Sequence, residues 1–157
     1  MTSPSPDHPR IPLLFYIVGE EVDDDDADGM EELVSKLAGS RSWTIAPPEF
    51  IDDVEEGTQE RDLDLPLVGG VVEIYSGYPP WGDRLPLEVD RAQLDEVRCT
   101  IAALSDFSRE YDREIAIEYG GELIGTIVAG APHPTLTEGL LGPWEQQLAR
   151  REGGGAP

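Results

Sequence analysis

The sequence is poor in cysteine and in lysine, and it has no long apolar run. The single cysteine among 157 residues, Cys99, excludes an internal disulfide framework and a cysteine-rich zinc site. No stretch approaches the roughly 18 consecutive apolar residues of a transmembrane helix. The first ten residues lack the basic-then-apolar pattern of a secretory signal peptide, so we expect a cytoplasmic protein. Lys36 is the one lysine beside ten arginines, which together with the abundant glycine and proline indicates a GC-rich, bacterial coding sequence.

Charge of one sign dominates the composition. Thirty-three acidic residues against eleven basic ones give a formal net charge of -22. Such a surface repels nucleic acid and anionic lipid, so we expect neither as a direct partner, and it attracts basic proteins and divalent cations. Two acidic runs stand out: residues 20–32 hold nine acids and no base, and residues 49–64 hold eight acids and only Arg61.

The length predicts one domain. We expect a single compact α+β domain at residues 11–151, between disordered tails at residues 1–10 and 152–157. Apolar runs and alternation predict strands at residues 11–18, 67–75, 114–119 and 122–128, with weaker candidates at 42–46 and 50–54. Helical spacing of apolar residues predicts helices at 28–39, at 88–111 and from about 135 onward. The order β-α-β-β-α-β-β-α predicts a mostly antiparallel sheet packed on helices, and its first six elements match a ferredoxin-like sandwich.

Caps and glycines predict finer features of these elements. Asp28 and Glu31 have the spacing of a capping box, which predicts that the first helix begins there; Thr135 and Glu138 have the same spacing before the last helix. The pair Gly69-Gly70 predicts a bulge or a close approach of two backbones. Pro143 either kinks the last helix or stands at the start of a new one.

The pair Gly120-Gly121 between two apolar segments predicts a β-hairpin with a two-residue turn. In the simplest register Ile117 pairs with Ile124 and Ile115 with Thr126. That register places one set of side chains on the buried face: Ile115, Ile117, Ile124 and Val128.

The segment Asp24-Asp25-Asp26-Ala27-Asp28-Gly29 resembles the first half of an EF-hand calcium loop. Oxygens of Asp24, Asp26 and Asp28 would then be the ligands. Ser35, however, stands where the loop requires a bidentate glutamate. Calcium binding is therefore an alternative to an acidic loop whose last aspartate caps a helix, and we assign no metal ligand.

Residues with catalytic chemistry are few. His133 lies in Ala-Pro-His-Pro, where a carboxylate such as Glu138 could orient it as an acid–base pair; a surface loop or capping residue is the alternative. Cys99 lies beside the apolar stripe of the long helix and is expected to act as a small apolar residue. The glycine pairs lack the spacing of a phosphate-binding loop. We therefore assign no catalytic residue and no cofactor, and we expect a protein that is not an enzyme.

These features favour a small acidic inhibitor that binds a basic protein. In charge and size the chain is similar to many bacterial immunity proteins and antitoxins, and to inhibitors that mimic nucleic acid. The acidic runs would steer the partner, and aromatic residues of the loop 75–81 would be the buried anchor unless they fill the edge of the core. The predicted partner-binding residues are Asp23, Asp24, Asp25, Asp26, Asp52, Asp53, Glu55, Glu56, Tyr78 and Trp81.

Overall fold

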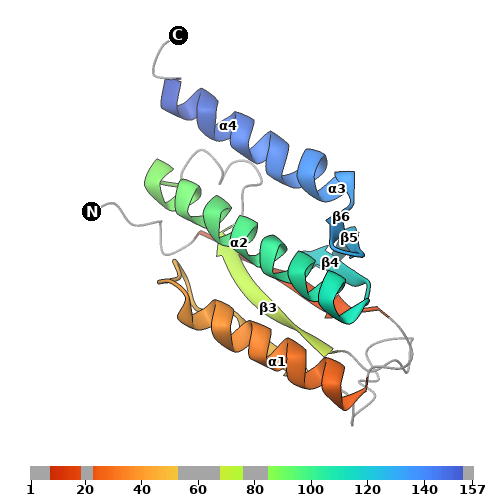
Figure 1. The fold of residues 1–157 in the computed structure, drawn as a ribbon. Coiled ribbons are helices and arrows are strands. Elements are labelled where there is room, and N and C mark those ends of the chain that lie inside the picture. The colour runs from red at the N-terminus through yellow and green to blue at the C-terminus, as the bar shows by residue number, and fades with distance from the viewer. Residues whose placement is uncertain (1–7, 19–22, 53–67, 76–84, 154–157) are drawn as a thin grey trace.

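A computed structural model describes residues 8–18, 23–52, 68–75 and 85–153 of the chain. It contains one six-stranded antiparallel sheet, in the order β2-β3-β1-β4-β5-β6, with its helices drawn beside it in Figure 1. The elements are β1 (Arg10–Ile17), α1 (Asp24–Gly39), β2 (Glu49–Asp52), β3 (Val68–Tyr75), α2 (Leu87–Tyr111), β4 (Ile115–Tyr119), β5 (Glu122–Val128), β6 (Ala131–Pro132), α3 (Pro134–Leu136), a π-helical turn (Thr137–Leu141) and α4 (Gly142–Gly153). The predicted α+β class with a mostly antiparallel sheet is confirmed.

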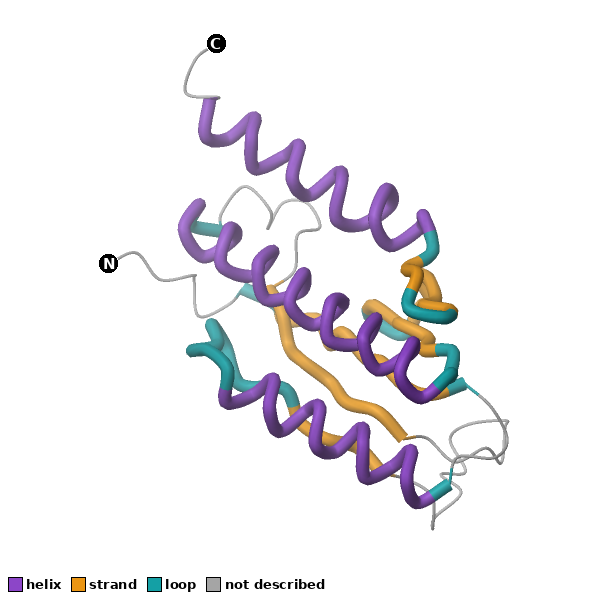
Figure 2. Tube along the Cα trace, viewed as in Figure 1, coloured by secondary structure: helices purple, strands orange, loops and turns teal. Residues whose placement is uncertain are grey.

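The first four strands have the connectivity of a ferredoxin-like sandwich. Helix α1 joins β1 to β2 across β3, and α2 joins β3 to β4 across β1, so each helical crossover encloses one antiparallel strand. Helices α1 and α2 lie side by side over the sheet, and α4 runs along the far side of α2 (Figures 1 and 2). Within the described residues, no helix combines the length and the apolar character that a membrane crossing needs.

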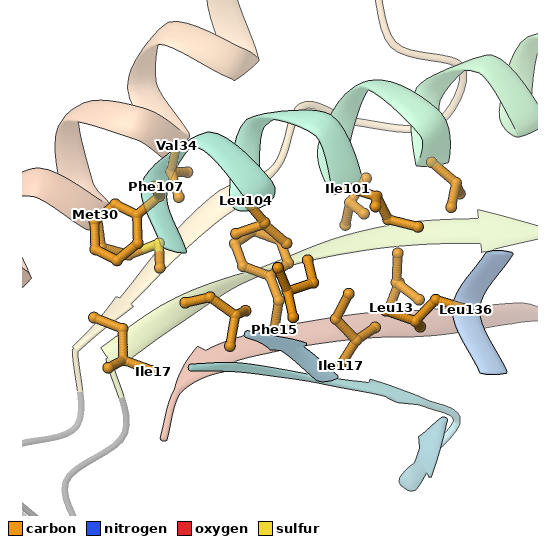
Figure 3. Close-up of a cluster of buried hydrophobic side chains, with 14 of the residues drawn as sticks. Leu13, Phe15, Ile17, Met30, Val34, Ile101, Leu104, Phe107, Ile117 and Leu136 are labelled. Atoms are coloured by element: carbon orange, nitrogen blue, oxygen red, sulfur yellow. The ribbon is translucent and has the colours of Figure 1, made fainter. Parts of the chain in front are cut away.

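The core lies between the sheet and the α1–α2 layer. Alternate residues of β1, namely Leu13, Phe15 and Ile17, point toward the helices and are at most 2% exposed. Figure 3 shows them meeting Leu104 and Phe107 of α2, while Met30 and Val34 come from α1. One face of each element is therefore buried. The apolar stripe of α2 is the one predicted, whereas the continuous apolar run at 11–18 predicted a buried strand without selecting a face.

The glycine pair of β3 serves a close approach and forms no bulge. The register between β1 and β3 runs without a break to the pair Tyr16–Gly69. A Cβ atom at Gly69 would collide with the carbonyl oxygen of Phe15, and one at Gly70 would lie 2.6 Å from the Cζ atom of the Phe15 ring. Because Gly69 and Gly70 have no side chains, β3 leaves room for Phe15, the largest buried side chain of β1.

Helix α1 begins one turn earlier than predicted. Asp23 is its N-cap: the Asp23 carboxylate accepts the N–H of Asp26, and the Asp26 carboxylate accepts the N–H of Asp23. Asp28 is inside the helix, so the capping box predicted at Asp28 is wrong. In a run of aspartates several residues can cap equally well, and the earlier start places three carboxylates in the first turn, where the helix dipole favours them.

The β4–β5 turn is confirmed, but the predicted register is wrong. Gly120 and Gly121 both have positive φ, as the two-residue turn requires. The register then shifts at Ile117/Glu118, so Ile117 pairs with Gly125 and Ile124 is an extra residue. Because a one-residue slip exchanges the two faces of a strand, Ile127 is buried and Val128 is 52% exposed.

Two further segments differ from the expectations. The weak candidate at 42–46 forms no strand, whereas the one at 50–54 is confirmed over its described residues as the short edge strand β2. The sheet starts at Arg10, and His8 is buried with its ring against Tyr75, so the end of the expected N-terminal tail is part of the fold.

The C-terminal helical segment is capped by a different residue from the one predicted. His133, and not Thr135, is the N-cap, because its Nδ1 accepts the N–H of Thr135. Pro143 stands in the first turn of α4, where its missing N–H is tolerated, and a π turn precedes it. His133 thus acts as a capping residue, one of the alternatives that the sequence left open.

Candidate functional site

The fold places the start of α1, in the first acidic run, and Asp52, in the second, at one end of the molecule. The acids of the second run after Asp52 lie outside the described residues. Strand β1 ends there and leads into α1, so residues 20–32 follow the end of β1. Asp52, the last residue of β2, pairs with Val68, the first of β3, so the chain between them leaves and re-enters the sheet at one place. The start of β3 and the end of β1 are neighbours through the pair Tyr16–Gly69. Figure 1 shows the beginnings of α1 and β3 and the end of α2 on the same side.

We call this end the acidic pole. Its described side chains come from the start of α1 and from the connection between α2 and β4. That connection lies at the same end because Ile115 pairs with Ile17. All the acidic side chains except that of Asp26 are exposed. The pole comprises seven carboxylates, those of Asp23, Asp24, Asp25, Asp26, Asp28, Asp112 and Glu114.

Arg113 lies among these carboxylates and is bound to the most buried one. The Arg113 guanidinium lies 2.6 Å from Oδ2 of Asp26, whose side chain is 6% exposed. The same carboxylate completes the capping box with Asp23. The N–H of Asp26 lowers the pKa of Asp23, so Asp23 stays ionised well into the acid range. The ion pair of Arg113 is made with the buried Asp26, and its charge also helps to lower the pKa of the exposed Asp23.

A groove between α1 and α2 adjoins the pole. It encloses about 440 Å³, and buried Leu37 and Phe107 are among its lining residues. Tyr111, the last residue of α2, also lines the groove and stacks on Phe107 with ring centroids 4.3 Å apart. Burial raises the pKa of Tyr111, and the carboxylates of Glu110 and Glu32 raise it further, followed by those of two aspartates of the pole. The groove thus combines apolar contact area with negative potential.

A second cavity lies at the opposite end of the sheet. It has a volume of about 200 Å³ and is lined by Tyr75, Tyr119, Trp144 and the buried Asp90. Trp144 Nε1 donates a 2.6 Å hydrogen bond to Oδ1 of Asp90, which attaches α4 to the start of α2. This contact joins two helices that the sequence alone did not pair.

The two predicted parts of the interface begin at opposite ends of β3. Strand β3 has eight residues, so the pole and Tyr75 are about 23 Å apart along it. The loop that carries Tyr78 and Trp81 starts beyond Tyr75, at the end away from the pole. Five of the predicted residues lie outside the described part of the chain: Asp53, Glu55, Glu56, Tyr78 and Trp81. Asp52 is described by its backbone, and Asp23, Asp24, Asp25 and Asp26 are brought together at the start of α1.

One buried polar cluster was not anticipated from the sequence. The Glu96 carboxylate, on a residue 2% exposed, accepts the N–H and the hydroxyl of Thr44 at 3.0 and 2.5 Å and the amide of Gln93 at 3.1 Å. Gln93 in turn accepts the N–H of Tyr75 at 2.6 Å. The cluster ties α2 to the segment after α1 and to the end of β3. Its signal was the spacing of Gln93, Glu96 and Thr100 on the apolar side of α2.

The loop geometry required by the calcium alternative is not formed. Asp24, Asp26 and Asp28 lie in a helix, where residues two positions apart point to opposite sides. Within the described residues, no group of three or more His, Cys, Asp or Glu side chains could hold a metal ion. His133, the residue considered for acid–base chemistry, is exposed and uses Nδ1 in its cap. Cys99 is half-buried, with Sγ 3.6 Å from the Arg41 guanidinium.

No protein-family model, no curated protein and no solved structure matches this chain.

Proposed function

We propose that this protein is a small acidic inhibitor that binds a basic target protein through the acidic pole. The observation that carries the proposal is the group of seven described carboxylates at one end of the fold, the end at which Asp52 leads into the rest of the second acidic run. There, the Arg113 guanidinium is already engaged by the buried Asp26. A concentrated patch of one sign attracts a partner of the opposite sign far better than the same charge spread evenly. The proposed encounter takes place in the cytoplasm.

The mechanism is electrostatic steering followed by steric blocking. Complementary charge raises association rates from about 10⁵–10⁶ to as much as about 10⁸–10⁹ M⁻¹s⁻¹ at low salt. The exposed aspartates at the start of α1 are held in a fixed array by the helix, so little side-chain ordering opposes binding. If the target acts on nucleic acid, as the targets of many immunity proteins and antitoxins do, the carboxylates of the pole would occupy the places of substrate phosphates. No bond is made or broken by this chain in such a role.

The test is an affinity capture from the native cell lysate with two matched variants. The pole variant replaces Asp24, Asp25 and Asp28 by Asn, which keeps the Asp23–Asp26 capping box intact. The control variant replaces three exposed acids outside both acidic runs by Gln: Glu88, Glu122 and Glu138. Each variant loses three negative charges, so only the position of the lost charge differs. Capture is performed at low and at high salt, and eluted proteins are identified by mass spectrometry.

We expect wild type and the control variant to retain the same basic protein at low salt and to release it at high salt. The pole variant should lose it, and the purified target should be inhibited by wild type. Equal retention by the pole variant and the control variant would refute the role of the pole. Retention of acidic or neutral proteins only would refute the class of partner.

A further inference from the structure

The groove between α1 and α2 has the dimensions of a helix-binding site. Its lining residues on α1 recur every three or four positions from Gly29 to Leu37 and are followed by the C-cap Ser40, and those on α2 extend from Ala103 to Tyr111. The helical residues from Gly29 to Gly39 span about 16 Å, which is also the length of three turns of an incoming helix. Leu33, Ala103 and Tyr111 are half-buried, so apolar surface remains accessible between the two helices. Ridges of a third helix pack into grooves of this kind.

The rim of the groove is acidic. Glu32 of α1 and Glu110 of α2 face the groove, and both contribute to the negative potential at the Tyr111 hydroxyl. Lys36 also lines the groove, and its ammonium lies 3.0 Å from Glu32, with both side chains more than 60% exposed. An exposed pair of this kind contributes little to stability, so a cation of a partner can replace it.

We propose that the α1–α2 groove is the anchoring site for a basic amphipathic helix of the target. This inference rests on the proposed function and deepens it. The lysines or arginines of the helix would lie between Glu32 and Glu110, and its apolar residues would pack on Leu33 and Ala103. The groove adjoins the acidic pole because two of its lining residues, Gly29 and Tyr111, are direct sequence neighbours of Asp28 and Asp112 of the pole. A partner steered to the pole therefore arrives beside the groove.

The groove offers an anchor among the described residues, whereas Tyr78 and Trp81, the anchors expected from the sequence, lie outside them. Phe107 and Tyr111 line the groove and stack on each other, and Tyr111 directly precedes Asp112 of the pole. Helix-in-groove recognition uses apolar anchors at i, i+3, i+4 and i+7, flanked by charge, and the lining of this groove provides the complement to that pattern.

A helical peptide of leucine and lysine, roughly 14 residues long with apolar residues on one face, is the probe. Binding is measured by calorimetry, and amide chemical shifts locate the peptide on the protein. The variant Ala103→Arg places a cation and a long side chain inside the groove. The control Ala102→Arg adds the same charge at the next residue of α2, which is exposed and does not line the groove. Circular dichroism establishes that each variant is folded.

A second pair of variants tests for a gain of affinity, which misfolding cannot mimic. Lys36→Gln releases Glu32 from its present partner and should bind the peptide about threefold more tightly, in line with the small value of exposed pairs. Arg150→Gln on α4 changes the net charge equally at a remote exposed position and should leave the affinity within about twofold of wild type.

The inference predicts shift changes at Leu33, Ala103 and Tyr111 and a loss of at least about tenfold in affinity for Ala103→Arg but not for Ala102→Arg. The inference is overturned if both arginine variants bind like wild type, or if the peptide does not bind. If both arginine variants bind the peptide like wild type but neutralising Asp24, Asp25 and Asp28 removes peptide binding, the proposed function stands without the groove. If target capture and peptide binding are both insensitive to the pole, the proposed function fails as well.

Discussion

The ion pair between Arg113 and the buried Asp26 stabilises the start of α1 at the acidic pole, and breaking it should lower the stability of the fold. The Asp26 side chain is 6% exposed and that of Arg113 is 27% exposed, with 2.6 Å between the charged atoms. Replacing Arg113 by Leu leaves a buried carboxylate without its cation. Breaking a buried pair in this way costs about 3–5 kcal/mol. Since a quarter of the arginine is exposed, we expect the lower end, about 3 kcal/mol, or about 6–12 °C in melting temperature for a chain of this size.

A matched control is present in the neighbouring turn. Arg109 lies 2.5 Å from Asp106, but both side chains are more than 60% exposed. Arg109→Leu should therefore cost no more than about 1 kcal/mol. The double variant Arg113→Leu with Asp26→Asn removes the charge from both partners and should recover most of the loss, because no buried carboxylate remains unpaired.

Urea denaturation followed by circular dichroism measures the three free energies of unfolding. The reasoning is refuted if Arg113→Leu and Arg109→Leu are equally destabilised within about 1 kcal/mol. It is refuted as well if the double variant is less stable than Arg113→Leu alone. Either result would mean that Asp26 is solvated or otherwise satisfied, and that the start of α1 does not depend on Arg113.

Three further changes test the cap, the core and the strand contact. Asp23→Ala removes the carboxylate that caps α1 and should lower the melting temperature by a few degrees at neutral pH. Because the pKa of Asp23 is lowered in the fold, the difference in melting temperature between wild type and variant should be complete above about pH 4 and should vanish as the pH falls below that lowered pKa. Melting curves recorded across this pH range measure the difference. Leu104→Ala empties a fully buried position and should cost about 2–5 kcal/mol in urea denaturation. Gly69→Ala puts a Cβ atom 2.6 Å from the Cα atom of Tyr16 and should cost about 1–3 kcal/mol, with faster hydrogen exchange of the β1 amides.

The fold was predictable where one periodicity dominates a segment. The helical stripe through Leu104 indicates both the helix and its buried face, and the continuous apolar run around Phe15 indicates a buried strand, whose inward-facing residues the structure then identifies. The order of elements then limits the topology, because two helical crossovers around antiparallel strands produce the observed order of β1 to β4. The start of α1 was misplaced because every aspartate from 23 to 28 is an acceptable cap.

The register of the β4–β5 hairpin was missed although a signal was present. Gly125 interrupts an apolar strand, and such a glycine often marks a bulge or a close approach. Here both occur: the extra residue Ile124 precedes it, and a Cβ atom at Gly125 would lie 2.6 Å from Leu136 of α3. A distant element thus decides the local register, and sequence reasoning about the hairpin alone does not include it.

The acidic pole was only half predictable. Each acidic run is evident from the sequence, but the position of Asp52 at the same end as the start of α1 depends on the pairing of Asp52 with Val68 and on the position of β3 beside β1. The partner of Asp26 comes from the connection between α2 and β4 and carries no local signal. The groove beside the pole follows from the packing of α1 on α2, so its residues could be assigned only from the structure.

The association rate of the captured target is the most direct test of the central claim, that the acidic pole recognises a basic protein. It should be measured at low and high salt for wild type, for the pole variant Asp24→Asn, Asp25→Asn, Asp28→Asn, and for the control variant with three acids replaced elsewhere. The account predicts that the pole variant associates at least about tenfold more slowly at low salt and loses most of its salt dependence, while the control keeps both. Equal rates and equal salt dependence in the two variants would contradict it.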